Sequence, residues 1–443
     1  MGLSLGFHIP FATAGVGVPA IITLAEISAA ITKDRDYRDL AQRLASVFAV
    51  LLAVGVVSGT IVAVQLTLLW PRFMQLVGEI ISLPFLIEVF AFFIEAVFTA
   101  IYLYGGDRLA AWQRILSAGL VSLGAVASAV LITDANAFMN TPVGFTLRDG
   151  HVVDAHPWQA FFNPAFPSTA FHVAVSAYMT IGMAVAAFAA FNLLWARKHT
   201  RAFGYYRKTM MLSIAFGGIM AIATAIAGDL QGKFLGGHQP VKLAAAEGFF
   251  HTQTHAPMVI GGWPDATSQQ VIGGIPIPGL LSYLATGSPS GLVRGLADFP
   301  RWQWPPLYVH LLFDAMVGVG IYAIAVAIVA WVVRRFRRSR EDPFPHWVLW
   351  LVVAAGPLAL LGIEFGWVFA EIARQPWIVY GIMQTADAAT TNPAVPWVGV
   401  LFVLLYIVLA VATIRVLRRY LRRHPLKDAE APEEQPKREV WLP

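Results

Sequence analysis

The sequence predicts an all-α, polytopic membrane protein, and three observations support that prediction. Of the 443 residues, 57% are hydrophobic and only 13% are charged, and the mean hydropathy is +0.64, which lies outside the range of soluble domains. About nine apolar runs are each long enough to cross a bilayer, which takes about 20 helical residues. The basic residues are concentrated in alternate connections between those runs.

The apolar runs divide the chain into four parts. They lie at about 3–31, 44–70, 80–104, 112–133, 169–196, 208–227, 305–333, 347–371 and 396–417. We therefore expect six transmembrane helices within 1–227, an outer loop over 228–304, three helices within 305–420 and a polar cytoplasmic tail over 421–443. The first run lacks a preceding basic segment and a cleavage site, so it is interpreted as a mature helix and not as a signal peptide.

The basic residues also predict the orientation of the helices. The connections after the first, third, fifth and seventh helices, together with the C-terminal tail, hold 24 of the 31 Lys and Arg residues. Because loops rich in Lys and Arg stay in the cytoplasm, we expect the N-terminus outside and the C-terminus in the cytoplasm. These flanks account for the net charge of +5, so no nucleic-acid binding is inferred. The absence of cysteine excludes disulfides and thiolate metal sites.

Two pairs of carboxylates fall within apolar runs. Glu364 and Glu371 are seven residues apart, on one face of a helix, and Arg374 follows one turn later. Glu88 and Glu95 have the same spacing in an earlier run. Ionisable groups inside a membrane are costly and usually functional, so Glu88 and Glu95 predict a proton relay. The simpler alternatives are a helix-end ion pair for Glu371 with Arg374, and acids hydrogen-bonded only for packing in the earlier run.

A layer of potential haem ligands lies in the outer part of the predicted membrane span. His8, His172, Met316 and Glu371 come from four different predicted helices, and the predicted orientation places them at similar depth. His and Met are established axial ligands of haem iron, so this layer predicts haem binding. Taken alone, each would be interpreted as an interfacial or core residue. His310 is the next candidate ligand if Met316 is not one.

Five motifs resemble subunit I of the cytochrome bd-type quinol oxidases. They are FFIE at 92–95, NAFMNTPVG at 136–144, FHVAVSAY at 171–178, GHQPVKLAAAE at 237–247 and GWVFAEIARQPW at 366–377. Together with the nine helices, their orientation and the histidine of the first helix, the resemblance covers the chain up to its tail.

The resemblance implies a haem-binding role for eight residues. His172 and Met316 would be the axial ligands of a low-spin haem b. His8 and Glu371 would be ligands of two high-spin haems, one a haem b and the other a haem d or a second haem b. The last motif adds further expected haem-binding residues: Trp367, Arg374, Gln375 and Trp377.

The resemblance also implies a catalytic cycle. Quinol would be oxidised at Lys242 and Glu247, which flank a short apolar stretch expected at the membrane interface, and its protons would be released outside. O₂ would be reduced to water with protons that reach the haems from the cytoplasm through Glu88 and Glu95. A second membrane subunit, subunit II, would complete a heterodimer in a bacterial or archaeal cytoplasmic membrane, and small single-helix subunits are further candidate partners.

The sequence departs from the family pattern at three places. Glu88 and Glu95 are seven residues apart where the family usually has eight. Ala63 stands where the family has a glutamate. Asp314 replaces the basic residue expected just before Met316, which removes an expected partner of a haem propionate.

A proton-coupled membrane transporter that uses Glu88, Glu95 and Glu371 is the alternative from another functional class. It explains the acids but not the layer of His and Met residues. The sequence shows no clear internal repeat, whereas many transporters are built from repeated halves.

Overall fold

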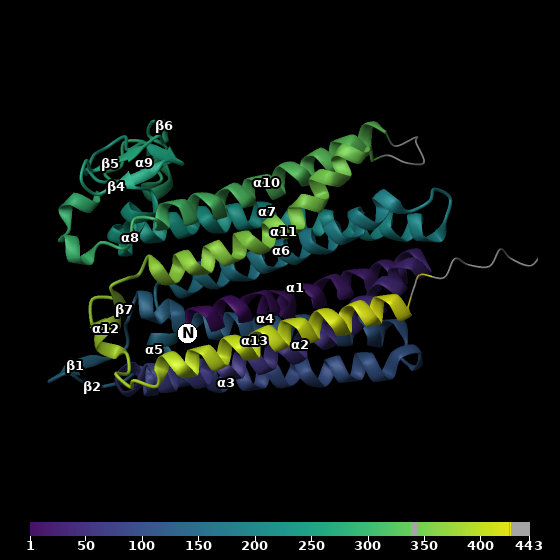
Figure 1. The fold of residues 1–443 in the computed structure, drawn as a ribbon, viewed down its shortest axis with the longest axis horizontal. Helices are drawn as coiled ribbons and strands as arrows, with labels where there is room; N and C mark the ends of the chain where they lie inside the picture. The colour runs from purple at the N-terminus through teal and green to yellow at the C-terminus, as the bar shows by residue number, and fades with distance from the viewer. Residues whose placement is uncertain (338–343, 425, 427–443) are drawn as a thin grey trace, which may run out of the picture.

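Long helices form the core of the fold (Figure 1). The computed structural model describes residues 1–337, 344–424 and 426. Within these residues, nine helices are long and apolar enough to cross a membrane, which confirms the predicted fold class. They are α1 (Gly2–Thr32), α2 (Arg35–Leu69), α3 (Pro71–Gly105), α4 (Ala111–Asn140), α6 (Phe166–Trp195), α7 (Arg201–His238), α10 (Val309–Phe336), α11 (His346–Ile372) and α13 (Val395–Arg423).

The remaining elements are short and lie in the connections. The short α-helices are α5 (Pro157–Phe161), α8 (Pro240–Ala246), α9 (Leu280–Thr286) and α12 (Thr385–Ala388). Four antiparallel pairs of strands accompany them: β1 (Thr146–Arg148) with β2 (His151–Val153), β3 (Met258–Ile260) with β6 (Ile275–Ile277), β4 (Trp263–Asp265) with β5 (Gln270–Ile272), and β7 (Trp377–Val379) with β8 (Met383–Gln384).

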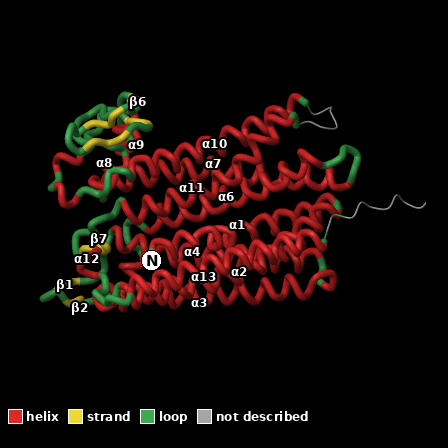
Figure 2. The backbone as a smooth tube through the Cα atoms, viewed as in Figure 1, coloured by secondary structure: helices red, strands yellow, loops and turns green. Residues whose placement is uncertain are grey.

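The helices form two packed groups. One core joins α6, α7, α10 and α11, and the other joins mainly α1 to α4. Almost all the strands and short helices gather at one end of the bundle, here called the loop end (Figures 1 and 2). The chain begins at the loop end, and α13 finishes at the opposite end, here called the tail end. The start of α1 and the end of α13 therefore lie at opposite ends of the bundle, as an odd number of crossings requires.

Local sequence explains the sharp turn between α1 and α2. Lys33 ends α1 in the left-handed conformation, with φ of 57°. The side chain of Asp34 then accepts a hydrogen bond from the backbone amide of Asp36 at 3.0 Å and so caps α2. Only two residues are needed to reverse the chain direction.

Two predicted boundaries were wrong. The sixth transmembrane helix was expected to end at 227, but α7 continues to His238, so the connection at the loop end begins at Gln239. Each glycine in this extension costs about 0.5–1 kcal/mol relative to alanine, but the segment packs against α9, and that packing outweighs local propensity. The tail was expected from 421, but α13 ends at Arg423. Most of the predicted tail lies outside the described residues.

Candidate functional site

A cavity of about 360 Å³ lies among α6, α7, α8, α10 and α11 at the loop end. His172 from α6, Met316 from α10 and Trp367 from α11 line it, and so do Lys242 from α8 and Glu247, the C-terminal cap of α8. Most of the other lining residues are apolar. The structure therefore brings five of the predicted site residues together from distant parts of the sequence.

Several buried polar atoms around this cavity lack a hydrogen-bond partner among the described residues. They are Nδ1 of His172, Oγ1 of Thr180, Oε1 of Gln239 and Oε2 of Glu247. Buried polar groups in folded proteins are nearly always paired. Their concentration on one cavity wall indicates a site that is completed by the polar atoms of a bound molecule.

The thioether of Met316 lies against Gly366 of α11. A Cβ atom at position 366 would lie 2.9 Å from Sδ of Met316, so only glycine leaves the sulfur room in this position. On the other side, Cε1 of His172 lies 3.9 Å from where a Cβ of Gly228 would be. The imidazole and the thioether are thus held by α6 and α10, with small residues of α7 and α11 beside them.

Lys242 and Glu247 are both buried. Nζ of Lys242 donates to the Ala370 carbonyl at 3.2 Å. Burial, and then repulsion from Arg374, lowers the pKa of Lys242 to about 7. Burial, and then the negative charge of Asp314, raises the pKa of Glu247 to about 8. Both groups can therefore exchange protons near neutral pH, as an acid–base site requires.

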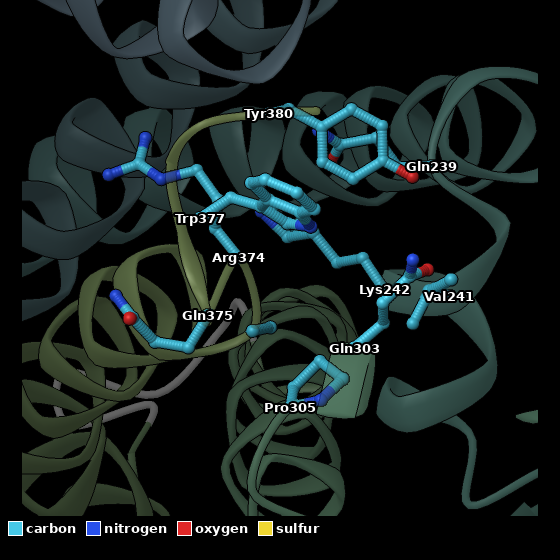
Figure 3. A pocket seen from close by; sticks show the side chains of 10 residues that line it. Gln239, Val241, Lys242, Gln303, Pro305, Arg374, Gln375, Trp377 and Tyr380 are labelled. Atoms are coloured by element: carbon cyan, nitrogen blue, oxygen red, sulfur yellow. The ribbon is translucent and has the colours of Figure 1, made fainter. Parts of the chain in front are cut away.

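Arg374, Gln375 and Trp377 line a smaller polar cleft that shares Lys242 with the large cavity. Figure 3 shows Trp377 close to Lys242, with Arg374 reaching from the end of α11. Nε and Nη1 of Arg374 are buried and, among the described residues, have no hydrogen-bond partner. A guanidinium with two free donors fits a carboxylate.

Glu371 uses both carboxylate oxygens within the protein. Its Oε1 accepts from Nδ2 of Asn136 at 2.5 Å, and its Oε2 accepts from Nη2 of Arg374 at 2.9 Å. The helix-end ion pair considered as the simpler alternative is therefore present. Asn136 also lines the large cavity, so Glu371 lies beside that cavity but not on its wall.

A chain of hydrogen bonds through Asn136 and Asn140 joins Glu371 to Lys242. Nδ2 of Asn140 donates to Oδ1 of Asn136 at 3.2 Å, and Nζ of Lys242 donates to Oδ1 of Asn140 at 3.5 Å. Gln239 also donates to Oδ1 of Asn140, at 3.1 Å. Sequence reasoning assigned no role to these amides, although Asn136 and Asn140 are four residues apart, on one face of a helix.

His8 is separate from the large cavity and faces α2. Its Nδ1 lies 3.0 Å from Oγ of Ser58, and that hydroxyl donates to the Val54 carbonyl at 2.8 Å. Ser58 must then accept from Nδ1–H, which leaves Nε2 of His8 as the acceptor nitrogen. A fixed tautomer of this kind is typical of metal-binding histidines.

Glu88 and Glu95 lie on α3 against α4, away from the cavity. Oε1 of Glu88 accepts from Oγ of Ser128 at 2.6 Å, and Glu95 is 4% exposed. The two carboxyl groups follow one face of α3, with Glu95 nearer the tail end. This arrangement is compatible with a relay towards the loop end.

A comparison with known proteins decides the family. Residues 1–425 match the family model described as "Cytochrome bd terminal oxidase subunit I". The chain belongs to this family. A Bacillus subtilis (strain 168) protein named as a candidate cytochrome bd menaquinol oxidase subunit I is 45% identical over 427 residues, which cover 96% of each chain. The cytochrome bd-II ubiquinol oxidase subunit 1 of Escherichia coli (strain K12) is 26% identical over 95% of this chain and 94% of its own length.

The fold agrees with a solved member of the family. The structure of bd oxidase from Geobacillus thermodenitrificans matches with a TM-score of 0.90 and 46% sequence identity, and the match covers 96% of this chain and 97% of that chain. As a subunit I of bd oxidase, this chain works with haem cofactors and with a subunit II.

The cavity fits a haem. An imidazole and a thioether are a known axial pair, and Nδ1 of His172 is buried without a hydrogen-bond partner among the described residues. The described residues contain no cluster of three or more His, Asp or Glu side chains that could hold a bare metal ion. A haem does not need such a cluster, because its porphyrin supplies four of the iron ligands.

Proposed function

We propose that this subunit I is the catalytic subunit of a quinol:O₂ oxidoreductase, with quinol oxidised at the large cavity. A quinol gives up two electrons and two protons, so its site needs both an electron acceptor and a base. The observation that supports the proposal is that one cavity is lined by His172 and Met316 and also by Lys242 and Glu247. Glu247, with an unpaired buried oxygen, is the proposed proton acceptor, and Lys242 orients the quinol oxygen.

We propose a haem arrangement that follows the same residues. His172 and Met316 would hold a low-spin haem b, while His8 and Glu371 would serve two high-spin haems, a haem b and either a haem d or another haem b. When bound, these haems supply one-electron carriers and the iron at which O₂ is reduced. The free donors of Arg374 would hold a propionate, and Trp367, Gln375 and Trp377 would enclose the haems.

The proposed orientation places the loop end outside the cell. Protons from quinol would then leave Glu247 on the outer side. Protons for water formation would enter from the tail end, past Glu95 and then Glu88. A bacterial or archaeal cytoplasmic membrane is the proposed location. This chain and subunit II form the proposed heterodimer, and small single-helix subunits are further proposed partners.

Replacing Glu247 with glutamine tests the quinol site. Loss of the base is expected to lower quinol oxidation by about 10²–10⁴-fold. In the parent protein the anionic base forms only as pH rises through about 8, so the rate is expected to rise with pH below that value and to level off above it. The variant should lose this rise. The measurement is quinol-driven O₂ consumption across pH 6–9.

The matched control is Glu79→Gln, an exposed glutamate on α3. It should behave as the parent at every pH. A Glu247→Gln protein that keeps its haems and oxidises quinol at the parent rate would show that Glu247 is not the base.

Glutamine at position 95 or 88 is expected to slow O₂ reduction by at least about tenfold, because the amide keeps the shape of the side chain but cannot carry a proton. Reduction of the low-spin haem by quinol should be unaffected. Stopped-flow measurement of the two half-reactions separates these effects, with Glu79→Gln as the control. If turnover of both variants equals that of the parent, α3 is not the proton route.

A further inference from the structure

His310 at the start of α10 is fully buried and touches the loop end through both of its ring nitrogens. Nδ1 lies 2.8 Å from the Ala246 carbonyl, and Nε2 lies 3.0 Å from the Gly261 carbonyl. The two nitrogens therefore each lie within hydrogen-bond distance of a backbone carbonyl, and the two carbonyls belong to different segments of the chain.

Asp314, one turn further along α10, contacts both His310 and the Gly261 turn. Its Oδ2 lies 3.5 Å from Nε2 of His310 and accepts a hydrogen bond from the Gly261 amide at 2.5 Å. Gly261 has φ of +67°, in the turn between β3 and β4. Asp314 also acts electrostatically on Glu247. Asp314 is thus directed towards the loop.

The carbonyls of Ala246 and Gly261, which His310 contacts, belong to segments close to Glu247 of the quinol site. Ala246 is the residue directly before Glu247 and ends α8. Gly248, directly after Glu247, lies against His310 and the strand region, because a Cβ at Gly248 would lie 3.6 Å from the His310 ring and 2.6 Å from Val271 of β5. His310 is therefore the point at which α10, the end of α8 and the strand region meet.

We propose that His310, paired with Asp314, is a positioning residue for quinol oxidation that fixes Glu247 on the cavity wall. The pair ties both α8 and the Gly261 turn to the helix that bears Met316, so the proton acceptor and the proposed haem ligand keep a constant separation. This proposal rests on the proposed quinol site. It also excludes His310 as the alternative axial ligand, since both of its nitrogens are occupied.

The test uses His310→Gln and Asp314→Asn in the purified oxidase complex. Glutamine cannot keep both contacts of the imidazole ring, and asparagine keeps an acceptor for the Gly261 amide but loses the carboxylate beside His310. Displacement of a catalytic group by about 1 Å can cost about 10²-fold, so kcat/KM for short-chain menaquinol and ubiquinol analogues should fall by at least about tenfold in each variant. Haem content, and O₂ reduction driven by an ascorbate-reduced amine mediator that bypasses the quinol site, should equal those of the parent.

Two further measurements separate positioning from a general loss of folding. The double variant should lose no more than the worse single variant, because residues that act as one unit are not additive. Amide hydrogen exchange over 246–262 should be faster in His310→Gln than in the matched control His251→Gln, an exposed histidine of the same loop.

The outcomes distinguish this proposal from the quinol site itself. If Glu247→Gln impairs quinol oxidation while both His310→Gln and Asp314→Asn stay within twofold of the parent, the positioning role is wrong and the quinol site stands. If Glu247→Gln has no effect, the quinol site is wrong as well. Equal losses in quinol-driven and mediator-driven activity would show that His310 only stabilises the structure, and this result would overturn the proposal.

Discussion

Replacing Glu371 with alanine is expected to abolish O₂ reduction and to remove a high-spin haem from the purified protein. The carboxylate lies at the end of α11, where one oxygen accepts a hydrogen bond from Asn136 and the other accepts one from Arg374. These two hydrogen bonds fix the orientation of the carboxylate at the loop end. An anion so placed suits ferric iron. Removing it would leave Arg374 buried without its ion-pair partner, which itself is costly.

The haem-to-protein ratio separates a ligand from a helix-end ion pair. A ligand role predicts a lower ratio in Glu371→Ala even in the fraction that remains folded. An ion pair alone predicts lower thermal stability with a full ratio and normal turnover per folded molecule. Arg374→Lys is the companion variant, since lysine keeps the charge but not the planar guanidinium with its several donors. Glu79→Ala is the control.

Replacing Met316 with leucine is expected to change the spectrum and potential of the low-spin haem. Leucine keeps the volume of the side chain but has no thioether, and the axial ligand strongly affects haem potential. Leucine branches where methionine does not, and Sδ of Met316 already lies close to the backbone of Gly366. A modest loss of stability is therefore also expected. Quinol-driven turnover should fall accordingly.

A redox titration followed in the visible spectrum measures this effect. Met211→Leu is a suitable control, because Met211 of α7 is partly buried against the core formed by α6, α7, α10 and α11 and lies outside the cavity lining. A Met316→Leu protein with the parent spectrum and potential would rule out Met316 as a ligand.

The sequence predicted the transmembrane helices well because hydropathy alone defines them. The nine predicted apolar runs correspond to the nine membrane-length helices found among residues 1–337 and 344–424. The end of α7 was missed because residues 228–238 are rich in glycine and polar side chains, and their helical state depends on packing against α9. A property that arises from tertiary contacts cannot be read from local composition.

The candidate site was predicted by residue type and resemblance, but its geometry was not. The motifs pointed to His172 and Glu247, the layer of His and Met residues pointed to Met316, and the structure places all three on one cavity. Nothing in their spacing indicated that both nitrogens of His310 would meet backbone carbonyls, since those carbonyls belong to segments more than 40 residues away. The presence of an acidic residue at position 314 is explained by its contacts with His310 and the Gly261 amide.

The most direct test of the proposed function is a visible spectrum of the purified complex, recorded in air-oxidised form and again after reduction by a short-chain quinol. We predict that quinol alone produces the absorption bands of a reduced low-spin haem b together with those of high-spin haem, and that His172→Ala lacks the low-spin band. A protein without haem bands, or one whose haems are reduced by dithionite but not by quinol, would contradict the proposal that this chain is the catalytic subunit of a quinol oxidase.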